Sequence, residues 1–187
     1  AGVQEVVGAY LPGLFAVAHG ESADIPRKPG PTGLLRTIEE LGSAPERTVY
    51  VGDSTGDVAV ARNAGTYAVG VTWGYHGAAR LRAAAADLVI SRSGATTLTE
   101  LSALGRAAIL IPSPYVAENH QYFNAKAFAD AGAGLLIEEK DLPQTDLFQM
   151  VCDIVFDKEK LRKMEQSART LYNRNCLDDI YNEIQTL

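Results

Sequence analysis

The stretch DLVISRSGATTLTE, residues 87–100, decides the fold, because a strand, a loop of small residues and a helix follow one another within it. DLVI (87–90) is apolar along most of its length, which is typical of a strand in a parallel sheet that is covered on both faces. The loop SRSGA (91–95) then leads into a helical pattern over 95–104. Backbone N–H groups at such a helix start favour an anion, so we predict a ligand site here.

The same alternation of strand and helix extends in both directions. It predicts an α/β fold, a single doubly wound, Rossmann-like parallel sheet of six strands followed by C-terminal helices. Glycines close four of the expected helices, as left-handed helix ends require: Gly42, Gly65, Gly105 and Gly132. Strands are expected at 14–18, 48–52, 67–71, 87–90, 107–111 and 134–138, and helices near 31–41, 56–64, 77–85, 95–104, 119–131 and beyond 147.

Composition restricts the class of protein. With 187 residues, 47% of them hydrophobic, the chain can form one domain over 1–187. The net charge of −6 without a basic cluster argues against nucleic acid and anionic membranes as partners. Apolar runs are far shorter than the ~20 residues of a membrane span, and the N-terminal segment does not resemble a signal peptide. We interpret Cys152 and Cys176 as reduced thiols and therefore predict a cytoplasmic protein. We expect a monomer or a dimer.

Two motifs in the first half indicate phosphate chemistry. RKPGP (27–31) contains Lys28, and VGDSTGD (51–57) places Asp53 and Asp57 between a strand and a helix. Two carboxylates suit a hard cation such as Mg²⁺, and a lysine neutralises phosphate charge. The alternative interpretation is that all three are solvated loop and helix-start residues.

With YLPGLF (10–15), ARNAG (61–65) and VGVTWGYH (69–76), these motifs resemble the haloacid dehalogenase superfamily, in particular its phosphoglycolate phosphatases, over about residues 1–90. The resemblance implies that Lys28 balances phosphate charge and that Asp53 and Asp57 form a weak, vestigial metal site. The DxDxT segment that supplies the family's nucleophile does not occur among the 187 residues. We therefore expect no catalytic residue, no required cofactor, and at most weak Mg²⁺ binding.

From residue 87 onward the sequence, including ENHQYFNA (118–125), resembles the C-terminal domain of the MurG family, which transfers N-acetylglucosamine from UDP-GlcNAc. The resemblance implies that a diphosphate lies along the loop, that Glu100 binds the ribose, and that three residues of the later segment read the sugar. Glu100 is otherwise a solvent-facing helix residue, Asn124 a capping or core-edge amide, and Arg92 a surface arginine that pairs with a neighbouring loop. The implied UDP-sugar ligands are Ser93, Gly94, Ala95, Thr96, Thr97, Glu100, His120, Gln121 and Asn124.

Both families share a doubly wound sheet, so DLVI is a strand at which they can be joined. We predict that 1–86 and 87–187 are two half-domains of one domain, with strand order 3-2-1-4-5-6. In sequence terms this order is 67–71, 48–52, 14–18, 87–90, 107–111, 134–138. The strands at 14–18 and 87–90 then lie side by side, and a small anion or UDP-sugar is expected in the crevice between them.

Three functions follow from this reading. The first is a non-catalytic, recombined or engineered chimera that retains at most weak UDP-GlcNAc or phosphate binding. The second is the donor half of a UDP-GlcNAc-dependent glycosyltransferase that needs another domain. The third is a vestigial magnesium-dependent phosphatase. Turnover separates the second and third from the first.

Overall fold

The computed structural model describes residues 2–74 and 85–186. Five strands form one sheet in the order β1-β2-β3-β4-β5: β1 Val49–Gly52, β2 Tyr67–Val71, β3 Leu88–Ser91, β4 Ala108–Leu110 and β5 Gly134–Leu136. The pairs β1–β2, β2–β3 and β4–β5 are parallel. The α/β class and the parallel sheet are therefore confirmed, whereas the expected number of six strands is wrong.

The expected strand at 14–18 does not form. This segment is irregular, and Leu14 and Phe15 are 71% and 55% exposed. The strand at 67–71 pairs directly with β3, Val69 lying opposite Leu88. The predicted strand order is therefore wrong, and the ligand crevice expected between 14–18 and 87–90 does not exist. Because the described strands follow chain order, the sheet has no reversal of strand order at which such a crevice would open.

The pairing of β2 with β3 has a local cause in Asp87. Its backbone N–H donates to the Ala68 carbonyl at 2.8 Å, and its carboxylate accepts from the Ala68 N–H at 2.8 Å. Arg62, from the helix before β2, completes the arrangement with an ion pair to Asp87 at 2.8 Å. These contacts fix the start of β3 beside β2, directly ahead of the apolar residues of the strand.

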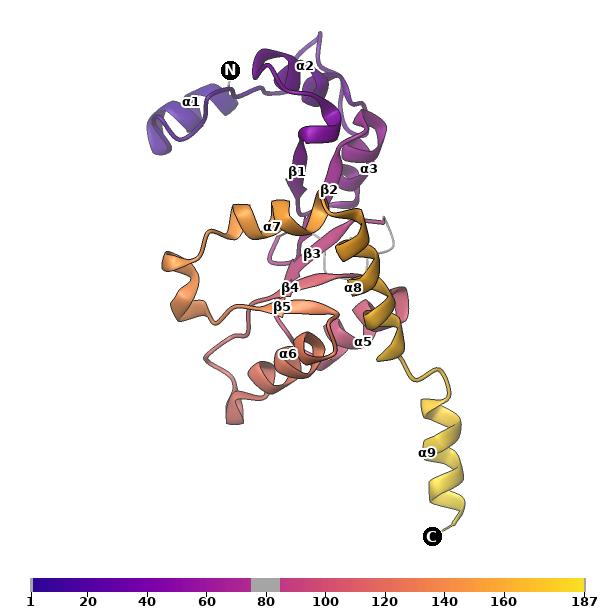
Figure 1. Ribbon diagram of the computed structural model, residues 1–187. Coiled ribbons are helices and arrows are strands. Elements are labelled where there is room, and N and C mark those ends of the chain that lie inside the picture. The colour runs from indigo at the N-terminus through magenta and orange to yellow at the C-terminus, as the bar shows by residue number, and fades with distance from the viewer. Residues whose placement is uncertain (1, 75–84, 187) are drawn as a thin grey trace. The chain divides into compact units, whose positions relative to one another are not determined.

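The chain divides into two compact units, residues 1–90 with 148–156, and residues 91–147 with 157–187. The division falls inside β3, between Ile90 and Ser91. The first unit contains α1 Gly2–Tyr10, α2 Thr32–Glu40, α3 Thr55–Ala64 and α7 Leu147–Val155. The second contains α5 Ala95–Leu104, α6 His120–Asp130, α8 Lys158–Thr170 and α9 Cys176–Gln185 (Figure 1).

Each unit has its own apolar core. In the first, α3 and α7 bury residues such as Val58 and Ile154 together with strand residues such as Val69. Tyr67 and Phe156 add an edge-to-face ring contact at 5.1 Å. In the second, Ile109, Leu110 and Phe128 are fully buried. α8 buries Met164 and Ala168 there, whereas α9 has no buried residue.

The helix ends agree with the sequence. Gly42, Gly65, Gly105 and Gly132 all have φ between 59° and 75°, as predicted. The helices expected at 31–41, 56–64, 95–104 and 119–131 correspond to α2, α3, α5 and α6. The helix expected at 77–85 lies almost wholly outside the described residues. No helix in the described part of the chain is long and apolar enough to cross a membrane.

Gly134 allows β5 to approach β4 closely. A Cβ atom at this position would lie 2.5 Å from the Ala108 carbonyl oxygen and 3.0 Å from the Phe128 ring. Because a backbone oxygen cannot move without shifting the strand, we expect Gly134→Ala to lower the free energy of unfolding by about 2–3 kcal/mol. Urea denaturation measures this change.

The matched control is Gly56→Ala in α3, where the new Cβ would meet neighbours only at 3.6 Å or more. This change should leave stability unchanged or raise it by about 0.5–1 kcal/mol, because alanine favours helix. Equal stability of Gly134→Ala and wild type would show that β5 does not require the close approach.

Candidate functional site

The phosphate-type motif of the first unit forms a hydrogen-bonded cluster around Asp57. Ser54 caps α3, its hydroxyl accepting from the Asp57 N–H at 3.2 Å, while the Ser54 N–H donates to Asp57 Oδ2 at 3.0 Å. The other carboxylate oxygen, Oδ1, binds Lys28 Nζ at 2.5 Å and Tyr50 Oη at 3.1 Å. The structure thus brings Lys28 and Asp57 together, as the sequence implied.

The cluster holds a buried charge. Burial, the largest single influence, would raise the pKa of Asp57, but the hydrogen bonds from Lys28 and Ser54 together outweigh it and lower that pKa below its ordinary value. Burial likewise works against the ammonium of Lys28, yet the contact with Asp57 raises the pKa of Lys28 overall. Both groups are therefore charged at neutral pH and form an ion pair.

In this arrangement, the Asp57 carboxylate is poorly available to bind a cation. Both of its oxygens already accept hydrogen bonds, and the residue is 4% exposed. Asp53 packs against the backbone of Gly74, where a Cβ would lie 2.0 Å from Asp53 Oδ2. Among the described residues, no group of three or more His, Cys, Asp or Glu side chains is placed to hold a metal ion. The donor set therefore fits Mg²⁺ only if Asp57 releases Lys28.

The two pKa shifts predict how stability changes with pH. Asp57 has a lowered folded pKa, so its contribution is present above the unfolded value of about 3.9 and is lost as pH falls through the folded value. Lys28 has a raised folded pKa, so its contribution is present below about 10.4 and is lost as pH rises further. The stability difference between wild type and Asp57→Asn should be constant from about pH 5 to 9 and should shrink below about pH 4. Urea denaturation across a pH series tests this, and a difference that stays constant as pH falls below about 4 would contradict it.

In the second unit, the loop after β3 leads into an α5 N-terminus that lacks a side-chain cap. Gly94 is the N-cap residue, with φ −64° and ψ 148°, and as a glycine it provides no side-chain cap. A Cβ at Gly94 would meet nothing within 4 Å, so the space beside the loop is open. Ala95 and Thr96 are exposed, and Thr97 and Glu100 are half-buried. The first turn of α5 therefore offers backbone N–H donors to an anion.

The N-terminus of α6 holds this loop in place. Ser93 is fully buried, and its hydroxyl donates to the Gln121 carbonyl at 2.8 Å. Asn124 Nδ2 donates to the Ser93 carbonyl at 3.1 Å, and Gln121 Oε1 accepts from the Ser113 N–H at 3.0 Å. His120 Nδ1 lies 2.9 Å from the Ala117 carbonyl. The residues implied to read a sugar thus brace two loops, and Asn124 occupies the core-edge position that was its alternative.

Arg92 also follows its alternative interpretation. It donates to the carbonyls of Ile111 and Pro112 at 3.2 and 3.1 Å, and it pairs with Glu139 Oε2 at 2.5 Å. The guanidinium therefore joins the loops that follow β3, β4 and β5. It acts as a brace for the loops at the carboxyl ends of these strands.

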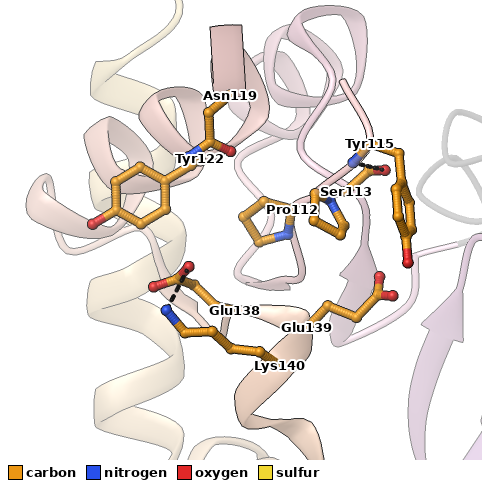
Figure 2. Close-up of a pocket in the computed structure, with 9 residues that line it drawn as sticks. Pro112, Ser113, Tyr115, Asn119, Tyr122, Glu138, Glu139 and Lys140 are labelled. Carbon is orange, nitrogen blue, oxygen red and sulfur yellow. Dashed lines mark hydrogen bonds and ion pairs between the residues drawn. The ribbon is translucent and has the colours of Figure 1, made fainter. Parts of the chain in front are cut away.

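A pocket of about 260 Å³ lies at the carboxyl ends of β4 and β5. Figure 2 shows the rings of Tyr115 and Tyr122 on opposite sides of it, with Glu138 and Lys140 along one wall. The sequence motifs predicted no role for these residues, although Tyr122 lies within ENHQYFNA. PSPY (112–115) directly follows the strand predicted at 107–111, and IEEK (137–140) covers the end of the strand predicted at 134–138 and the two residues after it. Their position at the carboxyl ends of strands was the signal available.

Two residues directly before α6, one of which lines this pocket, have left-handed backbone conformations. Glu118 and Asn119 precede α6 with φ 53° and 50°. Asparagine tolerates this left-handed conformation, but for glutamate it costs about 1–2 kcal/mol. The strain is maintained by the surrounding contacts and fixes the position of Asn119, which lines the pocket.

Comparison with known proteins adds to this geometry. A family model described as glycosyltransferase family 28 C-terminal domain matches residues 57–180, and one described as haloacid dehalogenase-like hydrolase matches residues 11–71. The first match begins upstream of residue 87, so α3 and β2 fall at least partly in both. A helix and strand of this kind recur in many doubly wound folds, which accounts for the overlap.

Curated relatives match the C-terminal half. The UDP-N-acetylglucosamine–N-acetylmuramyl-(pentapeptide) pyrophosphoryl-undecaprenol N-acetylglucosamine transferase of Desulforamulus reducens is 45% identical over 103 residues, 55% of this chain and 28% of that protein. The corresponding Bacillus cytotoxicus transferase is 49% identical over 101 residues, again 28% of its length. The chain thus spans under a third of these relatives. A crystal structure of Acinetobacter baumannii MurG shares the fold, with a TM-score of 0.56 and 22% identity over 84% of this chain and 46% of that one.

Proposed function

Because the chain belongs to the glycosyltransferase family 28 C-terminal domain family, we propose that its second unit binds a nucleotide-sugar donor, UDP-GlcNAc, weakly. The observation that carries this proposal is the uncapped N-terminus of α5 beside the open space at Gly94. A diphosphate bound there would accept hydrogen bonds from the first N–H groups of the helix, and the helix dipole would favour its charge.

Specific roles follow for the residues around the loop. Ser93, Gly94, Ala95, Thr96 and Thr97 lie along the diphosphate, and Glu100 accepts hydrogen bonds from the ribose hydroxyls. His120, Gln121 and Asn124 contribute to the sugar end. Because Gln121 and Asn124 already bond to Ser113 and Ser93, their main contribution is to hold the loops in the binding conformation.

We further propose that the 187 residues alone bind a donor without transferring its sugar, and that two families were recombined in this chain. The two family matches cover largely different parts of the chain and overlap only over residues 57–71, which supports the recombination. The alternative is the donor half of a transferase, completed by another domain. A magnesium–phosphate site at Lys28, Asp53 and Asp57 would be weak, since Asp57 is occupied by Lys28. Two cysteines without a disulfide fit a cytoplasmic location.

Isothermal titration calorimetry with UDP-GlcNAc and with UDP tests the proposal. We expect a Kd in the high micromolar to millimolar range, about −4 to −6 kcal/mol. Glu100→Ala should weaken binding about tenfold, because a carboxylate–hydroxyl hydrogen bond contributes about 1.5 kcal/mol. The control Glu183→Ala removes one negative charge from exposed α9 and should leave the Kd unchanged. Equal affinity of wild type and Glu100→Ala would remove Glu100 from the site.

A further inference from the structure

The pocket at the carboxyl ends of β4 and β5 has a size that limits its ligand. Its volume of about 260 Å³ is below the roughly 300–1,000 Å³ typical of sites for drug-sized molecules. A complete nucleotide-sugar is too large for it, whereas a single six-membered ring with its substituents fits. No residue that lines it belongs to the set assigned above to the donor.

Its charges are balanced within the second unit. Lys140 pairs with Glu138 at 3.2 Å, and Arg92 pairs with Glu139 at 2.5 Å. A phosphate would find no cation without a carboxylate partner among these residues, so an anionic ligand gains little here. The carboxylates can still accept hydrogen bonds from ligand hydroxyls while they remain paired, because each offers about four lone-pair sites.

The aromatic side chains supply apolar faces. Tyr115 is 88% exposed, and Tyr122, which is half-buried, makes an edge-to-face contact with Phe123 at 5.6 Å. Pro112 and Pro114 add further apolar surface to the pocket. A pyranose has a C–H face suited to such surfaces and a rim of hydroxyls suited to amides and carboxylates.

The walls are held in place before any ligand binds. Gln121 fixes the Ser113 backbone at 3.0 Å, and Arg92 binds the Pro112 carbonyl at 3.1 Å. Asn119 stands at the rim in a left-handed backbone conformation. Such bracing lowers the entropy lost on binding, so even a small neutral ligand can be retained.

We propose that this pocket binds one neutral pyranose ring, the ring resting on Tyr115 and its hydroxyls bonding to Glu138 and Asn119. This site needs no nucleotide and is separate from the proposed diphosphate site at Gly94–Thr97. A ligand of about a dozen non-hydrogen atoms at ordinary efficiency has a Kd of roughly 1–5 mM.

The test is a titration of ¹⁵N-labelled protein with methyl N-acetyl-β-D-glucosaminide, followed by NMR. We expect saturable shifts at the amides of Ser113, Tyr115, Asn119 and Lys140. Tyr115→Ala and Glu138→Gln should each weaken binding about fivefold to tenfold. Tyr181→Ala, which removes a tyrosine that is 63% exposed on α9, is the control and should bind like wild type.

Three results would overturn the proposal. The first is the lack of a saturable shift at 50 mM glycoside, which is about ten times the weakest Kd expected. The others are shifts at amides outside the pocket and shifts that Tyr115→Ala does not affect. A glycoside that binds equally well to Gly94→Asp, in which the diphosphate site is blocked, would show that the pocket is independent of the nucleotide-sugar proposal. Loss of glycoside binding in Gly94→Asp would mean that the ring binds at the donor site instead, which contradicts a separate pocket. Tighter binding of glucose 6-phosphate than of glucose would contradict the balanced charge.

Discussion

Asp57→Ala is expected to lower the free energy of unfolding by about 2–4 kcal/mol, because it removes a buried hydrogen-bond acceptor and a helix cap. The substitution leaves the Lys28 ammonium, the Tyr50 hydroxyl and the Ser54 N–H without their acceptor. It also removes the capping box of α3. Because Asp57 is 4% exposed, water replaces the lost acceptor poorly.

Two variants bracket this result in urea denaturation. Asp57→Asn keeps the shape and one acceptor oxygen but removes the charge. It should therefore lower the free energy of unfolding by less than Asp57→Ala does. Glu21→Ala breaks the Arg27–Glu21 pair, which has an N···O distance of 2.6 Å but is largely exposed, and should leave the free energy of unfolding almost unchanged. A loss below 1 kcal/mol for Asp57→Ala would mean that the cluster does not hold the first unit together.

Gly94→Asp should abolish binding of UDP and UDP-GlcNAc while leaving stability unchanged or raising it by a few tenths of a kcal/mol. Aspartate is a better N-cap residue than glycine, and its carboxylate interacts favourably with the α5 dipole. The new side chain enters space in which a Cβ meets no atom within 4 Å. The same carboxylate occupies the N–H donors and repels a diphosphate, so stability and binding should change independently.

Gly94→Asn is the matched control, because it also caps the helix but carries no charge. It should weaken binding less than Gly94→Asp does. The difference in affinity between the two variants should shrink with added salt, because salt screens the charge of the aspartate. Calorimetry and thermal unfolding of the same samples measure both properties. Unchanged UDP binding in Gly94→Asp would exclude the α5 N-terminus as the diphosphate site.

Local patterns allowed most elements to be predicted. β2 lies at the predicted residues, and β1, β3, β4 and β5 each lie within one or two residues of their predicted bounds. These segments combine apolar runs with clear stops, such as Gly65 and Gly105. The run LFAVA at 14–18 has the same composition, but in the structure it has no strand partner. A short apolar run does not determine pairing, which depends on tertiary contacts.

Strand order could not be read from motif resemblance. The prediction treated β3 as a point of exchange and placed 14–18 beside it. Pairing was instead fixed by Asp87 and Ala68, through two hydrogen bonds of 2.8 Å. A single aspartate at the start of a strand has several possible partners, so its role becomes visible only when both strands are placed.

The structure shows where the candidate site residues lie, whereas their roles stay predictions. Lys28 and Asp57 do meet, but as a saturated ion pair around a helix cap. Gln121 and Asn124 lie beside the expected loops, but their side chains brace backbone groups. Side-chain amides serve as ligands or braces equally well, and the sequence does not distinguish the two. Of the tyrosines in the pocket, Tyr115 belongs to none of the quoted motifs, and Tyr122 lies within ENHQYFNA but had no predicted role.

Titration of ¹⁵N-labelled protein with UDP-GlcNAc, followed by NMR, tests the central claim most directly. The account predicts saturable shifts that are largest at the amides of Gly94, Ala95, Thr96 and Thr97 and that disappear in Gly94→Asp. Shifts confined to the first unit around Lys28, or no shifts at concentrations of several millimolar, would contradict it.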